Sequence, residues 1–357
     1  MTERAKNLLA SMKLSEREGV LVYNPSNMFY LSGYLGEGLV LITHQCCAIV
    51  TDFRYTEQAE NEAPGFEVHM TGTGRCHEAI VGELCRQADI DTLYYEDDYV
   101  TVRTFEACRK HISDVEWKSV GGAVEALREV KDENELSLIA QACKLTGEAF
   151  ERLLPNIKEG MTEREVAEYI VSQYDAAGCD DTSFMPIVSY GANAADPHHE
   201  ADDTRLKAGD CIVIDMGCRK DRYCSDMTRT FFCKSADPKF AAIHDIVREA
   251  NELAESLIKP GIVLSELDKA ARDHIAKAGY GEYFTHRLGH FIGQTDHEKG
   301  DVSAVSTIVA KQGMIFSIEP GVYLPGEFGV RIEDLVLVTE DGCEILNKVD
   351  KHWNIVG

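Results

Sequence analysis

The sequence contains no apolar run long enough to cross a bilayer, and its first residues, MTERAKNLLASMKLSERE, lack the apolar core and cleavage site of a secretory signal. Its twelve cysteines include no Cys-x-x-Cys pair, which excludes a zinc ribbon or a regular disulfide framework. Basic residues are scarce, since 36 Lys and Arg stand against 61 Asp and Glu. The resulting net charge of −25 repels nucleic acid and anionic lipid. We therefore expect a cytoplasmic protein with reduced cysteines that binds neither nucleic acid nor a membrane surface.

The chain is long enough for two domains, and its pattern changes once. From Val20 to about Val120, short apolar runs alternate with helical stretches, which predicts a small α/β domain. After the short charged stretch 121–131, a long helical period begins at a capping-box pair, Asp132 and Glu135. The sequence thus predicts a two-domain α/β protein with domains at 1–125 and 126–357.

The stretch 210–230, DCIVIDMGCRKDRYCSDMTRT, is the most informative part of the second domain. Two runs typical of strands, Cys211–Met216 and Tyr223–Phe232, flank a polar turn, and they carry Asp215 and Asp226. An ionised carboxylate buried in such a run costs several kcal/mol unless it is compensated. A cation is the simplest compensation, and a strand-end acid held by hydrogen bonds is the plainer alternative.

The second domain also contains an internal repeat. In both copies a Lys-x-Gly word leads through an apolar strand to an acid, Asp215 in the first copy and Glu319 in the second. The following strand carries a further acid, Asp226 or Glu333. Two copies related by a pseudo-twofold axis would bring these four carboxylates together. The helical landmarks before them are a helix ending in IKEG (157–160) or IKPG (258–261) and a second helix capped by Thr162 and Glu165 or by Ser265 and Asp268.

Four carboxylates in one core must share protons or bind cations, because like charges at contact distance cannot all stay ionised. Two divalent ions about 3.5 to 4 Å apart would neutralise them. His290, in HRLGHFIGQTDHE, is the best candidate for a further ligand. Hard carboxylates with one imidazole favour Mn²⁺, with Co²⁺, Fe²⁺ and Zn²⁺ as alternatives.

These motifs resemble a known family. The words DMG, SDMTRT, GHFIG, HE, SIEPGVY and GVRIED follow one another as in the aminopeptidase P and prolidase branch of the pita-bread metallopeptidases, family M24. YLSGY and TDFRYTEQA resemble the creatinase-type amino-terminal domain of that branch. The resemblance implies a creatinase-like α/β domain followed by a pita-bread catalytic domain with an internal repeat. It also implies a homodimer.

The resemblance assigns the metal ligands position by position. Asp215 and Asp226 would hold one cation, and His290 and Glu319 the other. Asp226 and Glu333 would bridge the two.

The resemblance also implies roles in catalysis and substrate binding. His198, in AADPHHE, and His297, of the His-Glu pair, would donate hydrogen bonds to the substrate and the developing oxyanion. Arg331 would orient an active-site acid or pair with a substrate carboxylate. Tyr323 would bind substrate or act structurally. Glu319 would shuttle the proton to the leaving amine.

The implied activity is hydrolysis of the bond before proline, as an Xaa-Pro dipeptidase or an Xaa-Pro aminopeptidase, by attack of a hydroxide that bridges the metals. Proline-containing peptides or dipeptides would be the substrates. A catalytically silent pita-bread binding module and a metal-free creatinase-type hydrolase stay open as alternatives. Members of those kinds have lost ligands, whereas all five ligand positions are retained here. Asp196, His199 and Phe291 depart from the commoner pattern and bear on the shape of the pocket.

Overall fold

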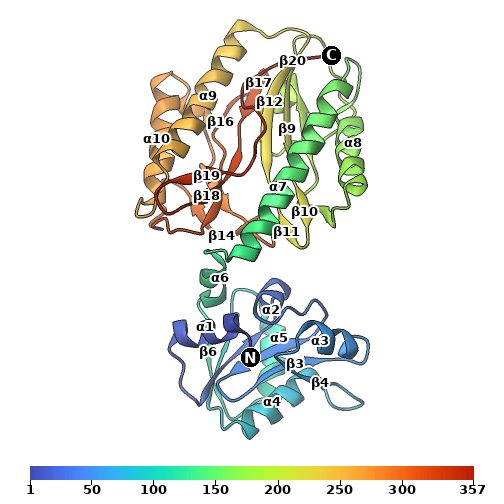
Figure 1. Ribbon diagram of the computed structural model, residues 1–357, viewed down its shortest axis with the longest axis vertical. Helices are drawn as coiled ribbons and strands as arrows, with labels where there is room; N and C mark the ends of the chain where they lie inside the picture. The colour runs from blue at the N-terminus through green and yellow to red at the C-terminus, as the bar shows by residue number, and fades with distance from the viewer. The chain divides into compact units, whose positions relative to one another are not determined.

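The computed structural model describes residues 1–357, which form two compact units, Met1–Arg128 and Glu129–Gly357 (Figure 1). The domain boundary expected at 125/126 falls inside helix α6 (Ala123–Arg128). The change in sequence pattern locates the connection between the two units only approximately, because it does not show that α6 continues to Arg128. No helix combines the length and the apolar character needed to cross a membrane.

The first unit is a six-stranded mixed sheet with helices on both faces. Its order is β4-β3-β2-β1-β5-β6, with β2 antiparallel to both of its neighbours and the remaining pairs parallel. Apolar side chains of α1, α2, α3 and α6 pack on one face, and those of α4 on the other. The elements besides α6 are β1 (Glu18–Val22), β2 (Leu39–Thr43), β3 (Cys47–Thr51), β4 (Glu67–Met70), β5 (Thr92–Tyr95), β6 (Glu116–Ser119), α1 (Glu3–Met12), α2 (Pro25–Ser32), α3 (Thr56–Glu62), α4 (His77–Gln87) and α5 (Val102–His111).

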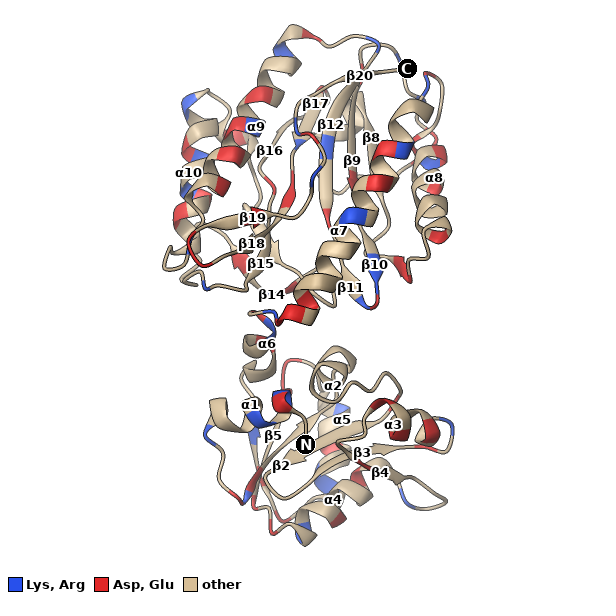
Figure 2. Ribbon diagram, viewed as in Figure 1, with Lys and Arg blue, Asp and Glu red and all other residues tan.

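Two pairs of helices cover the second unit: α7 (Glu133–Leu153) with α8 (Glu163–Ala176), and α9 (Pro238–Leu257) with α10 (Leu264–Lys277). The capping boxes predicted for α7 and α8 are both present. The cap predicted at Ser265 is wrong, because α10 begins after Val263, whose backbone pairs with Val309. Figure 2 shows acidic residues spread along α9 and α10.

Matched hydrogen bonds in the two halves confirm the internal repeat. Gly160 N donates to Leu206 O over 2.8 Å, and Gly261 N donates to Ala310 O over 2.9 Å. Each half then contributes three antiparallel strands in the same order, β8-β9-β12 and β13-β15-β18. These strands are β8 (Ile187–Tyr190), β9 (Cys211–Met216), β12 (Met227–Cys233), β13 (Gly289–Phe291), β15 (Ile315–Ile318) and β18 (Asp334–Val338), and the outer strands are β20 (Ile355–Val356), β14 (Glu298–Val302) and β19 (Cys343–Ile345).

Three of the four acids lie where a strand is interrupted. The run expected as one strand from Tyr223 to Phe232 breaks at Ser225 and Asp226, and its first part pairs in a separate hairpin of β10 (Cys218–Lys220) and β11 (Tyr223–Cys224). Gly217 permits this break, because a Cβ there would lie 2.0 Å from Ser225 O. In the other half, β16 (Gly321–Leu324) and β17 (Phe328–Arg331) form the matching hairpin and leave Glu319 and Glu333 outside the strands.

We predict that Gly329→Ala destabilises the second unit. A Cβ at Gly329 would lie 1.6 Å from Ala194 O, so β17 could not keep its approach to the turn Gly191–Ala195, which leads to His198. We expect the free energy of unfolding to fall by about 2 to 4 kcal/mol in urea titrations. Gly342→Ala is the matched control, since its added Cβ meets only ordinary contacts. Equal midpoints for the two variants would contradict this account.

Candidate metal centre and active site

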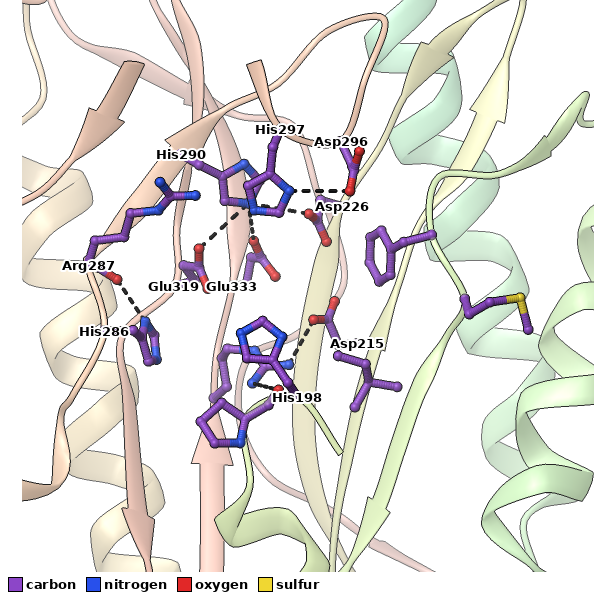
Figure 3. A pocket seen from close by; sticks show the side chains of 15 residues that line it. His198, Asp215, Asp226, His286, Arg287, His290, Asp296, His297, Glu319 and Glu333 are labelled. Atoms are coloured by element: carbon purple, nitrogen blue, oxygen red, sulfur yellow. Dashed lines mark hydrogen bonds and ion pairs between the residues drawn. The ribbon is translucent and has the colours of Figure 1, made fainter. Parts of the chain in front are cut away.

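A cavity of about 570 Å³ opens in the second unit (Figure 3). Eight of the nine residues expected from sequence line it, and Tyr323 does not. Aromatic and apolar side chains complete part of the wall, so the cavity is polar at its centre and apolar at one edge. The lining residues are Phe184, Met185, Ile187, Pro197, His198, Asp215, Asp226, His286, Arg287, His290, Asp296, His297, Glu319, Arg331 and Glu333.

His290 faces three of the acids from strand β13. Its Nε2 lies 3.6 Å from Asp226 Oδ2, 3.6 Å from Glu319 Oε1 and 3.9 Å from Glu333 Oε1, too far for hydrogen bonds of ordinary length. Its Nδ1 donates to Phe291 O over 3.2 Å, which fixes the tautomer. Burial lowers the pKa of His290 to about 3, so the ring is neutral and turns a lone pair toward the carboxylates.

Several carboxylate oxygens at this centre are buried without any hydrogen-bond partner, namely Asp215 Oδ1, Asp226 Oδ1 and Glu333 Oε1. Burial, followed by repulsion from neighbouring carboxylates, raises the pKa of Asp226 and of Glu333 well above the ordinary range. Burial raises the pKa of Glu319 to about 7. Asp226, His290 and Glu333 each offer a ligand atom within 4.8 Å of the other two. Buried carboxylates with unpartnered oxygens beside an imidazole lone pair are a donor set that suits a divalent cation, so these residues fit a metal.

Arg331 is fully engaged by the protein. Its Nη2 donates to Asp215 Oδ2 over 2.7 Å, its Nη1 to Tyr323 Oη over 3.1 Å and to Pro197 O over 3.3 Å, and its Nε to Thr228 Oγ1 over 3.1 Å. Of the two roles expected for Arg331, the geometry favours orienting an acid. Every nitrogen of Arg331 donates to a protein group, and its charge is paired with Asp215.

Tyr323 supports this arrangement from behind the cavity wall. Its side chain is buried, and its hydroxyl donates to His286 Nε2 over 2.9 Å while it accepts from Arg331. Burial lowers the pKa of His286 to about 4, which keeps that imidazole neutral and able to accept. The structural role expected as an alternative for Tyr323 fits these contacts better than a substrate contact does.

His198 and His297 lie on opposite sides of the acids (Figure 3). Both are exposed to the cavity. The ring of His297 stacks on His290 with 3.9 Å between centroids, and its Nδ1 lies 3.2 Å from Asp296 Oδ2. His198 is positioned through its backbone N, which donates to Asp196 Oδ1 over 3.0 Å. Both imidazoles can therefore reach a ligand in the cavity.

The loop that carries His297 is held by a buried ion pair. Lys131 Nζ lies 3.2 Å from Glu298 Oε2, with the two side chains 1% and 6% exposed. The other oxygen of Glu298 accepts from Gln294 N over 2.9 Å. A Cβ at Gly293 would lie 2.5 Å from Glu298 Oε1, so only glycine allows the loop to close on this carboxylate.

The departures from the commoner pattern shape the surroundings of the cavity rather than its wall. His199 lies with its Nε2 2.7 Å from Glu163 Oε2, which also accepts from Asp202 N. Glu163 Oε1 accepts from Tyr190 N and Asn193 Nδ2, so this group of His and acids is a hydrogen-bonded anchor for the 190–204 loop. Phe291 is buried against Phe316.

Seven cavity residues were not among the nine predicted from the sequence: Phe184, Met185, Ile187, Pro197, His286, Arg287 and Asp296. His286 and Arg287 stand in the same HRLGH word as His290, and this proximity was the available signal. Phe184 and Met185 carry no such signal, because only the fold brings their loop to the cavity.

Comparison with known proteins agrees with this geometry. Residues 137–340 match the model of metallopeptidase family M24, and residues 4–130 match the creatinase/prolidase N-terminal domain. An uncharacterized peptidase of Bacillus subtilis, YqhT, is 35% identical over 355 residues, which cover 99% of each chain.

Two solved structures match almost the whole chain. A Xaa-Pro dipeptidase from Bacillus anthracis superposes with a TM-score of 0.96 at 34% identity, covering 99% of each chain. An X-Pro aminopeptidase from Thermotoga maritima superposes with a TM-score of 0.91 at 33% identity, covering 97% of this chain and 100% of that one. The expected fold is thereby confirmed. The chain belongs to metallopeptidase family M24, in the prolidase branch, with a creatinase/prolidase domain preceding its peptidase domain.

Proposed function

We propose that the protein is a dinuclear metallopeptidase that hydrolyses the bond before proline, in Xaa-Pro dipeptides or at the amino terminus of Xaa-Pro peptides. The observation that carries the proposal is the cluster of buried carboxylates at the centre of the cavity. Three of them lie within 3.9 Å of His290 Nε2, and Asp215 Oδ1, Asp226 Oδ1 and Glu333 Oε1 have no hydrogen-bond partner. Two relatives whose names specify an Xaa-Pro bond support the substrate class. Twelve unpaired cysteines support a cytoplasmic location. The family resemblance supports a homodimer.

The five ligands divide between two cations. Asp215 and Asp226 would hold one, His290 and Glu319 the other, and Asp226 and Glu333 would bridge them. When bound, divalent cations supply a water activated at neutral pH and polarise the scissile carbonyl. We propose Mn²⁺ because four of the five ligands are hard carboxylates.

The remaining steps belong to side chains of this chain. Glu319, whose carboxylate lines the cavity, would take a proton and then deliver it to the proline nitrogen that leaves. His198 and His297, on opposite sides of the acids, would hold the substrate and stabilise the oxyanion with N–H donors. Arg331 keeps Asp215 in its ligand orientation.

Activity tests the proposal directly. With Mn²⁺ or Co²⁺ we expect release of the first residue from Ala-Pro or Ala-Pro-Ala, followed by amino-acid analysis, and none in the presence of a chelator. Ala-Ala is the matched control and should be cleaved far more slowly. If neither proline peptide is hydrolysed by metal-loaded protein, the proposal is wrong. A metal content near zero after metal loading would favour the silent binding module instead.

Asp226→Asn separates metal binding from folding. Because Asp226 bridges, we expect its loss to reduce the metal content from about two ions per chain to nearly none, measured by atomic emission. The metal-free variant should melt no lower than the metal-free wild type at pH 8, since the substitution removes one of several repelling charges. A variant that keeps both ions would rule out the bridging role.

Stabilisation by metal should grow with pH. In the metal-free protein the pKa values of Asp226, Glu319 and Glu333 are raised, so folding takes up protons. The destabilisation is absent below the ordinary carboxyl pKa of about 4 and grows as the pH rises; the part due to Glu319 is complete once the pH has passed through about 7. We expect Mn²⁺ to raise the melting temperature more at pH 8 than at pH 5.5, where protons compete for the ligands. An equal shift at both values would argue against these carboxylates as ligands.

A further inference from the structure

Two arginines, Arg287 and Arg331, line the cavity, and they differ in how far neighbouring protein groups bind their guanidinium groups. Each nitrogen of Arg331 donates to a protein group, namely Asp215, Tyr323, Pro197 O or Thr228, and its charge is paired with Asp215. The guanidinium of Arg287 makes no hydrogen bond and no ion pair, although its residue is part of the cavity wall. Arg287 is therefore the one arginine of the cavity that has its charge and its donors available for a ligand.

The backbone around Arg287 is firmly held. Buried Asp268 accepts from Leu288 N over 3.2 Å and from both Nε and Nη2 of Arg272. Arg272 in turn donates to His286 O over 2.9 Å and to Phe284 O over 2.8 Å. Arg287 O accepts from His286 Nδ1 over 2.7 Å. An unpaired side chain thus extends from a fixed base, which is the arrangement expected of a recognition residue rather than of a mobile surface charge.

The guanidinium of Arg287 lies on the side of the cavity where Glu319 and His290 are found (Figure 3). Glu319 is the acid proposed to protonate the leaving nitrogen. The proline that carries this nitrogen must therefore lie on the same side of the cavity as Arg287.

The chemistry of a dipeptide places a charge at this point. In Xaa-Pro the carboxylate is attached to the carbon next to the leaving nitrogen, whereas in Xaa-Pro-Yaa that position carries a neutral amide. Five carboxylates line the cavity, and the whole chain has a net charge of −25, so an incoming carboxylate needs a cation of its own. The fork of a guanidinium matches a carboxylate in two hydrogen bonds.

We propose that Arg287 binds the free carboxylate of the carboxy-terminal proline, and that this contact makes the protein a dipeptidase rather than an aminopeptidase. The inference rests on the proposed function. Arg287 is a specificity-determining residue in this account, and it takes no part in the hydrolytic step.

The test compares Ala-Pro with Ala-Pro amide, which has the same size but no terminal charge, and with Ala-Pro-Ala. For the wild type we expect a KM for Ala-Pro at least about tenfold below that for the amide, as for one charge-assisted contact. Arg287→Ala should raise the KM for Ala-Pro about tenfold, leave its kcat within about twofold, and leave the amide unaffected. Arg287→Lys should recover part of the loss. Arg152→Ala, an exposed arginine on α7, is the matched control.

Other outcomes overturn the inference. If Arg287→Ala slows Ala-Pro and its amide equally, the residue acts on the reacting groups or on the fold. If the wild type prefers Ala-Pro-Ala, no dipeptide recognition exists. A thermal-shift comparison of proline with prolinamide measures binding without hydrolysis. The wild type should bind proline more tightly, because prolinamide lacks the carboxylate. A protein that cleaves none of the peptides contradicts the proposed function. In that case the binding comparison still tests Arg287, because Arg287→Ala should lose the preference of the wild type for proline over prolinamide.

Discussion

Repulsion among buried carboxylates is the physical constraint on which the second unit depends. Asp226 and Glu333 are 4% and 1% exposed, and no lysine or arginine forms an ion pair with either carboxylate. The protein neutralises only Asp215, through Arg331, and it satisfies one oxygen of Glu333 with the Thr228 hydroxyl. It leaves the remaining charge to be balanced by protons or cations. Such a centre is costly for an empty fold and favourable for a loaded one, because metal binding and folding are linked.

The repeat supplies the geometry that brings these acids together, and polar contacts join the two halves at the seam. Thr230 Oγ1 donates to Arg331 O and accepts from Arg331 N, and Glu333 N donates to Thr228 O. Beside them, Arg229 donates to Asp334 Oδ1 over 2.7 Å in the core. β12 of one half is thus hydrogen-bonded at this seam to residues 331–334 of the other half. These contacts hold the carboxylates of the two halves in one place.

The sequence predicted those features that are encoded locally or repeated. Asp215, Asp226, Glu319 and Glu333 could be found because the same word order occurs twice, and the capping boxes because their partners are three residues apart. The features that were missed depend on contacts between distant segments. The strand break at Asp226 follows from the approach of Gly217 to Ser225 O. The early start of α10 follows from the pairing of Val263 with Val309. The contact between Tyr323 and His286 bridges residues that no local pattern connects.

The buried pair of Lys131 and Glu298 has a consequence for behaviour in concentrated salt. Dissolved ions screen exposed charges over a Debye length of about 8 Å at physiological ionic strength, but they screen buried pairs far less. Such a buried pair holds the loop that carries His297, and a second buried pair, Arg331 with Asp215, holds that aspartate. Arg287 is exposed. A rise in ionic strength should therefore weaken the binding of a charged substrate end by Arg287. The two buried ion pairs should persist, so that the residues they hold keep their positions in the cavity.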